Sequence, residues 1–467
     1  MKSNSYIKTI LITAIISLTS CEDFLEVETP NHKIVSESVF NNDQTALSAM
    51  TGIYNELFLA TFTGGGRETS VSILAGLSAD ELKTLRANDL NLIEFEENEI
   101  QPNNSRNLSI WTSAYNIIYM TNSLLEGVSK STTISEEVRL MLEGEASFIR
   151  AFTYFTLLNI YGEVPLILST DYRENALSTQ ATQADIYDQI LADLNVSITS
   201  LSAEYRDNDR TRVNRFAAIA MSARVHLYLE NWEEAERMSS QVIQNNSTYS
   251  ISQDLNTVFL ANSQEALWQI SPIGGSGILS YTNEGSTLIF HPSYPALTKV
   301  ALKDSLVNSF DEQDKRLENW IALHEETGNY YAYKYKDRSS INNISEYSMV
   351  LRLAEQFLIR AEARMQQGNL SAAKEDLDVI RERAGLNPIA LMEPSINEED
   401  LLTLILEERQ KELFTEWGHR WTDLKRTGRI QNVLDSKPSE WSDTDWLYPI
   451  PAQERMKNPN LNQNQGY

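Results

Sequence analysis

Hydrophobic residues recur at helical spacing along much of the chain. Positions i, i+3, i+7 and i+10 share one face of a helix. The first segment with this spacing contains Leu47, Met50, Tyr54 and Leu57. Further segments with the same period lie around residues 110–121, 148–158, 186–198 and 402–413. The pattern predicts a mainly α-helical protein.

Two of these helices are preceded by polar residues with the spacing of a capping box. Thr182 and Asp185 come before the segment 186–198, and Ser395 and Glu398 come before the segment 402–413. In a capping box, a Ser or Thr side chain accepts a hydrogen bond from the backbone N–H three residues further on. We therefore expect Thr182 and Ser395 to be N-caps.

The chain contains one internal repeat. Residues 223–242 and 361–380 align without gaps at an offset of 138 residues, and Ala223 and Ala235 match Ala361 and Ala373. Small residues at this spacing let paired helices approach closely, as in the two-helix tetratricopeptide unit, and stacked units bury a continuous core. Because the copies are far apart, we expect an interrupted array; two unrelated amphipathic hairpins are the alternative.

Two long segments, residues 61–107 and 246–345, lack the helical pattern and are predicted to be loop-rich inserts. Within the second we expect short strands at 266–270, 287–290 and 330–336; in the last of these, tyrosines alternate and so share one face. The expected fold is therefore mainly α, a tetratricopeptide-type helical-repeat scaffold with loop-rich inserts and a few short strands.

The first twenty residues have the features of a secretory signal peptide. Lys2 and Lys8 precede an apolar run, Ile10 to Leu18, that is too short to span a bilayer as a helix. The run ends in Leu18-Thr19-Ser20-Cys21, which resembles a bacterial lipoprotein cleavage box, and Cys21 is the one cysteine in the sequence. We predict lipidation of Cys21 and anchoring to a membrane without spanning it. A plain signal peptide with an incidental cysteine is the alternative.

Charge and cysteine content narrow the possible functions. The 467-residue chain has 39 Lys and Arg against 65 Asp and Glu, a formal net charge of −26 that becomes −28 without residues 1–20, which hold two lysines and no acid. Nucleic-acid binding needs a basic face, so this charge argues against it. It is also a mild argument against strongly acidic glycans. A single cysteine excludes an intramolecular disulfide and a thiolate metal site.

No motif for catalysis stands out. The five histidines are scattered, and Gly274 to Ile278 lacks the closing glycine of a nucleophile elbow. Paired carboxylates for glycoside hydrolysis need only be close in space, and nothing marks out two of the 65 acids. We therefore predict no catalytic residue, no metal and no cofactor, with a glycan-cleaving enzyme as the less favoured alternative.

Segments spread over the whole mature chain resemble the signatures of the SusD/RagB family. In chain order they are Cys21-Glu22-Asp23-Phe24-Leu25, Arg150-Ala151-Phe152-Thr153-Tyr154, Tyr161-Gly162-Glu163-Val164-Pro165-Leu166, Ala223-Arg224-Val225-His226-Leu227-Tyr228, Arg352-Leu353-Ala354-Glu355, Arg381-Glu382-Arg383-Ala384-Gly385-Leu386, Glu407-Glu408-Arg409, Arg420-Trp421-Thr422-Asp423-Leu424-Lys425-Arg426-Thr427-Gly428 and Gln463-Asn464-Gln465-Gly466-Tyr467. No single segment is decisive, but their order and spacing make the resemblance specific.

The resemblance implies an outer-membrane lipoprotein, lipid-anchored and facing the cell exterior, with a signal peptide at 1–20 and two intertwined regions, 21–245 and 246–467. Such proteins bind oligosaccharides or polysaccharides without cleaving them and deliver them to a SusC-like TonB-dependent transporter. The signature residues would mostly hold the scaffold together through salt bridges and helix packing. Some relatives capture oligopeptides, so a peptide-binding protein of the same architecture is an alternative.

One departure from the family bears on specificity. The starch-binding prototype has a tryptophan-rich loop after an Asp-Glu pair, whereas the stretch from Asp80-Glu81 to Arg86 has no aromatic residue, which argues against starch. Sugar faces stack on aromatic rings, and polar groups bind the hydroxyls. Our candidate ligand-binding residues therefore come from the inserts: Arg67, Asp80, Arg86, Asn104 and Arg106 from the first, and Tyr281, Tyr294 and Trp320 from the second. The three arginines could form a local basic patch that accepts acidic glycans.

Overall fold

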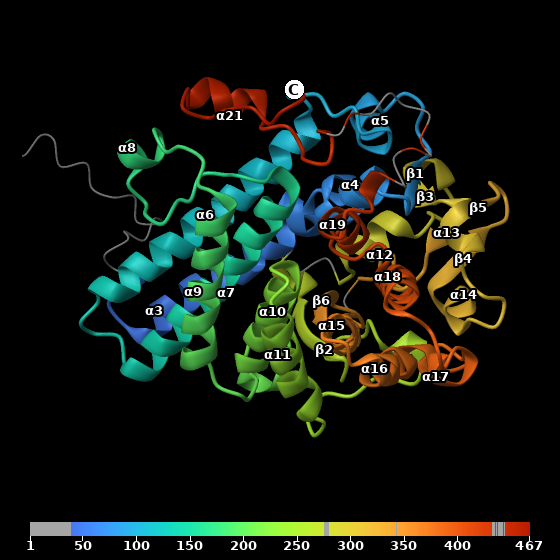
Figure 1. The fold of residues 1–467 in the computed structure, drawn as a ribbon. Helices are drawn as coiled ribbons and strands as arrows, with labels where there is room; N and C mark the ends of the chain where they lie inside the picture. Colours follow the sequence, from blue (N-terminus) through green and yellow to red (C-terminus); the bar gives the residue numbers. More distant parts are fainter. Residues whose placement is uncertain are drawn as a thin grey trace, which may run out of the picture.

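The structure is a computed structural model that describes residues 39–274, 280–341, 343–431, 435, 437, 442 and 444–467. The predicted signal peptide, Cys21 and most of the Gly274–Gly277 turn lie outside the described residues. The rest is mainly helical, as the periodicity predicts (Figure 1).

The first part of the chain forms a layer of long helices. These helices are α3 (Asp43–Leu59), α4 (Val71–Ser78), α5 (Leu90–Glu97), α6 (Ser105–Lys130), α7 (Glu136–Tyr161), α8 (Tyr172–Asn175) and α9 (Gln183–Ser200). α7 packs against both α6 and α9, and the hydrophobic stripe of α3 packs against α6 (Figure 1). Thr182 is the N-cap of α9, as predicted, and accepts a hydrogen bond from the backbone N–H of Asp185 at 3.2 Å.

The two copies of the internal repeat form two helical hairpins that lie against each other. The hairpins are α10 (Arg215–Tyr228) with α11 (Trp232–Gln244) and α15 (Leu353–Gln366) with α16 (Leu370–Arg383). α11 packs along α15, and the four alanines of the repeat, Ala223, Ala235, Ala361 and Ala373, are fully buried. The array is interrupted in sequence but continuous in space, which confirms the tetratricopeptide-type scaffold.

The segment between the hairpins, with the end of the first insert, carries the strands. They form three two-stranded antiparallel sheets: β1 (Leu82–Thr84) with β3 (Val300–Leu302), β2 (Ala266–Ile270) with β6 (Ser348–Arg352), and β4 (Ile321–His324) with β5 (Asn329–Ala332). The remaining helices are α12 (Asn283–Leu288), α13 (Asp304–Asn308), α14 (Lys315–Trp320), α17 (Ile389–Met392), α18 (Glu398–Leu413), α19 (His419–Arg426) and α21 (Ala452–Lys457).

Three local predictions are wrong. Ser395 is not the N-cap of α18, because Asn397 directly before the helix accepts from the backbone N–H of Asp400 at 3.0 Å. Residues 287–290 are not a strand, because Thr282 caps α12 and the helix runs to Leu288. Residues 61–107 contain helices α4 and α5; every residue of α4 is buried, so α4 has no amphipathic period to detect.

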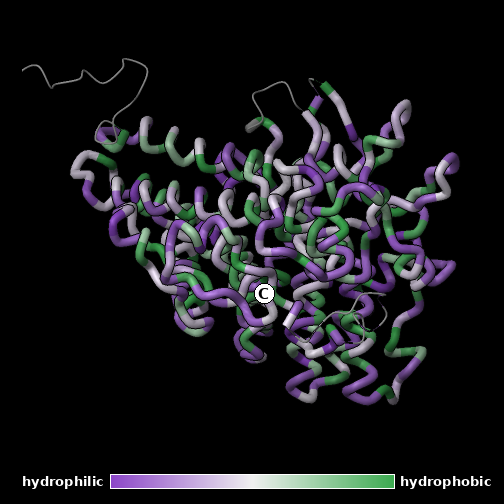
Figure 2. Tube along the Cα trace, turned by 90° about the horizontal axis from the view of Figure 1, so that it is seen from above, coloured by the Kyte–Doolittle hydropathy of each residue, from purple (hydrophilic) through white to green (hydrophobic). Residues whose placement is uncertain are grey.

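Trp268 of β2 joins the helical layer to the strands. Its ring makes edge-to-face contacts with Phe148 and Phe152 of α7, at centroid distances of 5.1 and 5.2 Å. Phe152 also contacts Trp417, which precedes α19, at 5.2 Å. Such contacts stabilise a core by about 0.5–1.5 kcal/mol each beyond area burial. Figure 2 shows hydrophobic and hydrophilic residues interspersed along the helices, as expected where each helix has a buried and a solvent face.

Candidate ligand-binding site

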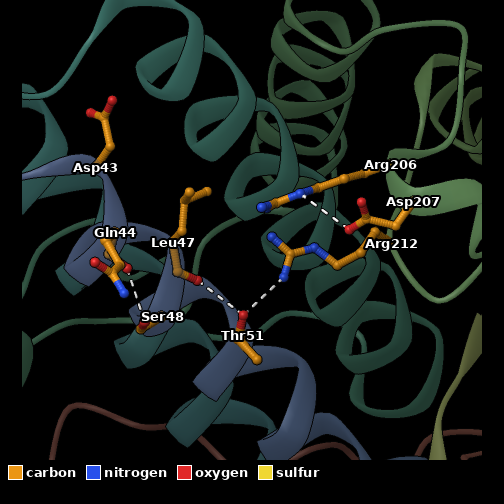
Figure 3. Close-up of a pocket in the computed structure, with 8 residues that line it drawn as sticks. All are labelled: Asp43, Gln44, Leu47, Ser48, Thr51, Arg206, Asp207 and Arg212. Carbon is orange, nitrogen blue, oxygen red and sulfur yellow. Dashed lines mark hydrogen bonds and ion pairs between the residues drawn. The ribbon is translucent and has the colours of Figure 1, made fainter.

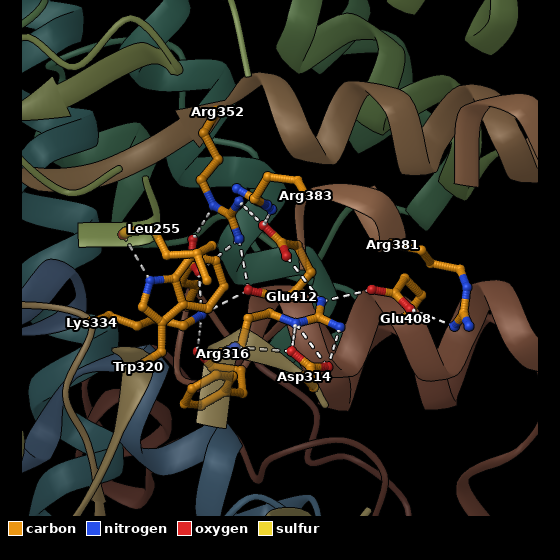
Figure 4. Close-up of polar contacts among 12 residues, drawn as sticks. Leu255, Asp314, Arg316, Trp320, Lys334, Arg352, Arg381, Arg383, Glu408 and Glu412 are labelled. Atoms are coloured by element: carbon orange, nitrogen blue, oxygen red, sulfur yellow. Dashed lines mark hydrogen bonds and ion pairs between the residues drawn. The ribbon is translucent and has the colours of Figure 1, made fainter. Parts of the chain in front are cut away.

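Arg352 and Arg383, two charged residues of the family signatures, belong to a buried ionic network. Arg352 and Arg383 both bind Oε1 of Glu412, and Arg316 binds its Oε2 at 3.1 Å (Figure 4). These four side chains are at most 2% exposed. They come from β6, α16, α18 and α14, so the network holds four elements together. The scaffold role predicted for the signature residues is confirmed.

The network fixes the charge state of Glu412. Burial acts to raise the pKa of this carboxyl, but the guanidinium groups of Arg383, Arg352 and Arg316 lower it well below its usual range. A carboxylate that is fully buried and surrounded by three cations is out of reach of a ligand. The network therefore holds the four elements together and does not itself form a binding site.

Asp80, a candidate from the first insert, is engaged within the scaffold. Its carboxylate accepts two hydrogen bonds from Arg420, at 2.8 and 2.7 Å, and a third from Gln410 at 3.1 Å. Asn104 is likewise engaged: it is 1% exposed, caps α6 and donates to Glu94 at 2.6 Å. Neither side chain is available to a ligand without breaking these bonds.

Trp320 lies in the core, not at a ligand surface. Its side chain is fully buried, its indole N–H donates to the carbonyl of Leu255 at 3.0 Å, and Lys334 lies over its ring at 4.9 Å. A ring enclosed on these sides cannot stack on a sugar, so Trp320 is left out of the proposed site.

Arg106 positions a turn that carries Arg67. Its guanidinium donates to Thr69 at 2.7 Å and to Asp89 at 2.8 Å. Thr69 ends the 3₁₀ turn Arg67–Thr69, and Arg67 itself has a positive φ of 52°. Non-glycine residues in this backbone region cost free energy and persist where the surroundings hold them. Arg106 is thus a positioning residue, and Arg67 is the exposed end of the arrangement.

Arg67 and Tyr281 lie close enough to Arg338, an arginine that the sequence did not single out, to shift its pKa. Burial lowers the pKa of Arg338, and the nearby charge of Arg67 lowers it further, whereas Tyr281 raises it. Arg338 donates from Nε to the carbonyl of Ile289 at 3.0 Å. Within the described ranges, neither guanidinium has a carboxylate partner. The cluster joins residues more than 200 positions apart in sequence. The sequence feature that could have indicated Arg338 is its place in the loop after the tyrosine-rich strand.

An aromatic row begins at Phe290, the residue after Ile289, whose carbonyl accepts the hydrogen bond from Arg338. Phe290 stacks on His324 at 4.5 Å and contacts Tyr331 at 5.4 Å, and Tyr331 contacts Tyr333 at 5.9 Å. Tyr294, a predicted candidate, is 64% exposed. We call Arg67, Tyr281, Arg338, Tyr294 and this aromatic row the insert surface. The last candidate, Arg86, is partly exposed on the loop after β1, where its backbone N–H donates to Thr84 at 3.2 Å.

Two carboxyl groups with raised pKa values lie beneath this region. Burial raises the pKa of Glu81 to about 8 and that of Glu284 to about 7. Perturbed acids of this kind mark some active sites. Here the cavity beside Glu284 has a volume of only about 10 Å³, and Glu81 is 2% exposed. This cavity is too small for a sugar, and burial is the first cause of both pKa shifts.

A larger cavity of about 520 Å³ lies between α3 and the turn Arg206–Asn208 (Figure 3). Arg212 points into it but is paired with Glu145 at 2.8 Å and lies over the ring of Tyr54 at 4.6 Å. Arg206 is beside Asp207 at 3.6 Å. No aromatic side chain lines this cavity, so it lacks the stacking surface expected of a sugar site.

Metal and membrane features were sought in the described part of the chain. No group of three or more His, Cys, Asp or Glu residues there is placed to hold a metal ion. Of the helices in the described ranges, none is long and apolar enough to cross a bilayer.

Comparison with known proteins decides the family. A family model described as "Starch-binding associating with outer membrane" matches residues 23–227, and the SusD family model matches residues 323–467. The chain belongs to the SusD family. This is a family of glycan-binding proteins.

Relatives and solved structures of the SusD family agree over nearly the full length. The SusD-like protein P25 of Formosa agariphila is 24% identical over 97% of both chains. A SusD superfamily protein from Bacteroides vulgatus superimposes with a TM-score of 0.79 at 22% identity, over 92% of this chain and all of that one. A laminarin-binding SusD-like protein superimposes with a TM-score of 0.76 at 24% identity, over 91% of this chain and all of that one. The mainly α, SusD-like fold is confirmed.

Proposed function

We propose that this protein is a non-catalytic lipoprotein of the outer membrane, anchored through Cys21 and facing the cell exterior. It captures oligosaccharides or polysaccharides and delivers them to a SusC-like TonB-dependent transporter. Family membership supports the class of ligand, and the cleavage box ending at Cys21 supports the anchor.

The observation that carries the proposal is the insert surface. Arg67 and Arg338 present guanidinium groups without carboxylate partners in the described ranges, beside Tyr281 and an aromatic row. By contrast, Arg352 and Arg383 of the scaffold are paired with buried acids. Guanidinium donors bind hydroxyl and carboxylate oxygens, and an exposed ring such as that of Tyr294, 64% exposed, can stack on a sugar face. This combination suits an extended glycan at a surface.

The closed environment of the perturbed acids supports binding without cleavage. A retaining or inverting glycosidase needs two carboxyl groups on either side of an accessible glycosidic bond. Glu81 and Glu284, the carboxyls with the raised pKa values given above, are not reached by a ligand-sized cavity.

The proposal is tested by purifying the native protein from outer membranes with a C-terminal affinity tag. We expect a TonB-dependent transporter to copurify, and carbohydrate to dominate the small molecules released from the complex. Release of peptides in its place would favour the oligopeptide alternative. Turnover of an oligosaccharide that disappears on replacing one carboxylate would overturn the non-catalytic assignment.

A further inference from the structure

A second pocket opens where α7, α9, α10 and α19 meet. Its volume is about 210 Å³, below the roughly 300–1,000 Å³ of pockets that hold drug-sized ligands, so it suits a single small ring. Asn159, Gln183, Tyr187, Tyr228, Lys425 and Trp446 are among the residues that line it. None of them belongs to the insert surface or to the buried ionic network.

Lys425 gives this pocket a cationic group. Its ammonium donates to the backbone carbonyl of Asn159, near the end of α7. Among the residues that the structure describes, it has no carboxylate partner, and burial alone lowers its pKa to about 7. An ammonium has three N–H groups, so two remain available. A bound anion would supply the missing counter-charge.

The neighbouring cation, Arg426, does not compete for that anion. It pairs with Glu362 and with Asp423. The two arginine contacts leave Lys425 as the pocket's uncompensated charge within the described ranges.

The walls of the pocket suit a sugar ring. Trp446 is 42% exposed, and Tyr187 is partly exposed beside it in the lining. The Gln183 side chain lies at the first turn of α9, and no partner for its amide is found among the described residues. Flat aromatic faces stack on the carbon faces of a pyranose, and free amide and indole N–H groups bind hydroxyls.

A purely structural role for Lys425, capping the end of α7, explains one of its N–H groups. It does not account for the tryptophan, the tyrosine and the glutamine amide that line the same pocket as the lysine.

We propose that this pocket binds the carboxylate of one acidic sugar residue, with Lys425 as the anion partner and Trp446 as the stacking surface. The sugar class rests on the proposed function, while the site itself is separate from the insert surface. The net charge of the chain does not prevent this, because charges more than about 8–10 Å away are screened at physiological ionic strength.

The test is a titration of the folded, lipid-free protein with methyl glucuronide and, in parallel, with methyl glucoside. Saturation-transfer NMR at mildly acidic pH, where the Lys425 amine is protonated, reports the binding of each. We expect the glucuronide to bind more tightly than the glucoside by about tenfold or more, because a charge-assisted contact is lost in the neutral sugar.

Two variants locate that binding, with a matched control. Lys425→Met should weaken glucuronide binding about tenfold or more and leave glucoside binding unchanged. Trp446→Ala, at an exposed position where folding is not at risk, should weaken both. Lys457→Met, which removes an exposed lysine paired with Glu454, should change neither.

The outcomes separate this proposal from the proposed function. If the glucuronide binds equally to wild type, Lys425→Met and Trp446→Ala, the pocket assignment is wrong, while glycan capture at the insert surface stands. If oligosaccharides bind and the isolated glucuronide does not, the second site is likewise contradicted. If no glycan of any length binds, the proposed function itself fails.

Discussion

Arg224 of α10 and Glu355 of α15 form a two-pronged ion pair, with Nε–Oε1 and Nη2–Oε2 distances of 2.6 Å. Their side chains are 3% and 1% exposed. The pair therefore joins the first helix of one repeat hairpin to the first helix of the other, across a gap of 131 residues in sequence.

Removing one partner of this pair should destabilise the protein strongly. Glu355→Ala leaves the Arg224 guanidinium buried without compensation, which costs about 3–5 kcal/mol. Replacing both residues with apolar ones, Arg224→Met with Glu355→Leu, should recover most of that loss. Urea denaturation of Arg224→Met, of Glu355→Leu and of the double variant measures the coupling. Additive losses in the double variant would contradict the account.

The lowered pKa of Glu412 predicts that the protein loses stability in acid. The pKa of this carboxyl is lowered in the folded protein, so its contribution is present above the ordinary value of 4.5 for a glutamate pKa and is lost as the pH falls below it. We expect the unfolding free energy to fall steeply below about pH 4.5. In Glu412→Gln, the protein should be less stable at neutral pH and its stability should vary less with pH in the acid range. An unchanged acid slope in that variant would show that other carboxylates dominate.

The raised pKa of Glu81 predicts that the unfolding free energy changes with pH in the opposite direction, falling as the pH rises. The folded pKa of this carboxyl, about 8, lies above the ordinary glutamate value of 4.5, so the native state keeps a proton that the unfolded chain loses. The resulting contribution declines as the pH rises from about 4.5 to 8. Glu81→Gln keeps an acceptor for the Thr415 N–H and cannot ionise. Relative to wild type, this variant should gain about 1 kcal/mol or more between pH 5 and pH 8, as measured by urea denaturation at both pH values. A constant difference between the two proteins would refute this account of Glu81.

The helical periodicity and the repeat could be predicted from the sequence, because both depend on local spacing. The scaffold role of the signature residues followed from the resemblance to the SusD/RagB family. Helix α4 was missed because all its residues are buried, and Ser395 was chosen as a cap because Asn397 offers the same chemistry two residues later.

The candidate site was less predictable, because its parts meet only in the fold. Arg67 and Tyr281 were named from their insert positions, but Arg338 was marked only by its place in the loop after the tyrosine-rich strand. From the sequence alone, Asp80 is as well suited as the other candidates to bind a sugar hydroxyl. Only the fold shows that Arg420 already binds its carboxylate.

The lipid anchor is tested by one substitution. Cys21→Ala should move the protein from the membrane fraction to the soluble fraction, because no acyl chain can then be attached. Labelled palmitate should be incorporated into wild type and not into the variant. Continued membrane attachment of the variant without label would contradict the assignment of Cys21.

The central claim is that the insert surface captures glycans through unpaired arginines. The direct measurement is isothermal titration calorimetry of the lipid-free protein against a broad oligosaccharide panel, repeated with Arg67→Ala and Arg338→Ala. Arg173→Ala is the control, because that arginine is 74% exposed and pairs with Asp171. We predict that at least one oligosaccharide binds wild type and the control equally, and that each of the two variants weakens it about tenfold or more with unchanged stability. No binding across the panel, or equal binding by all four proteins, would contradict the account.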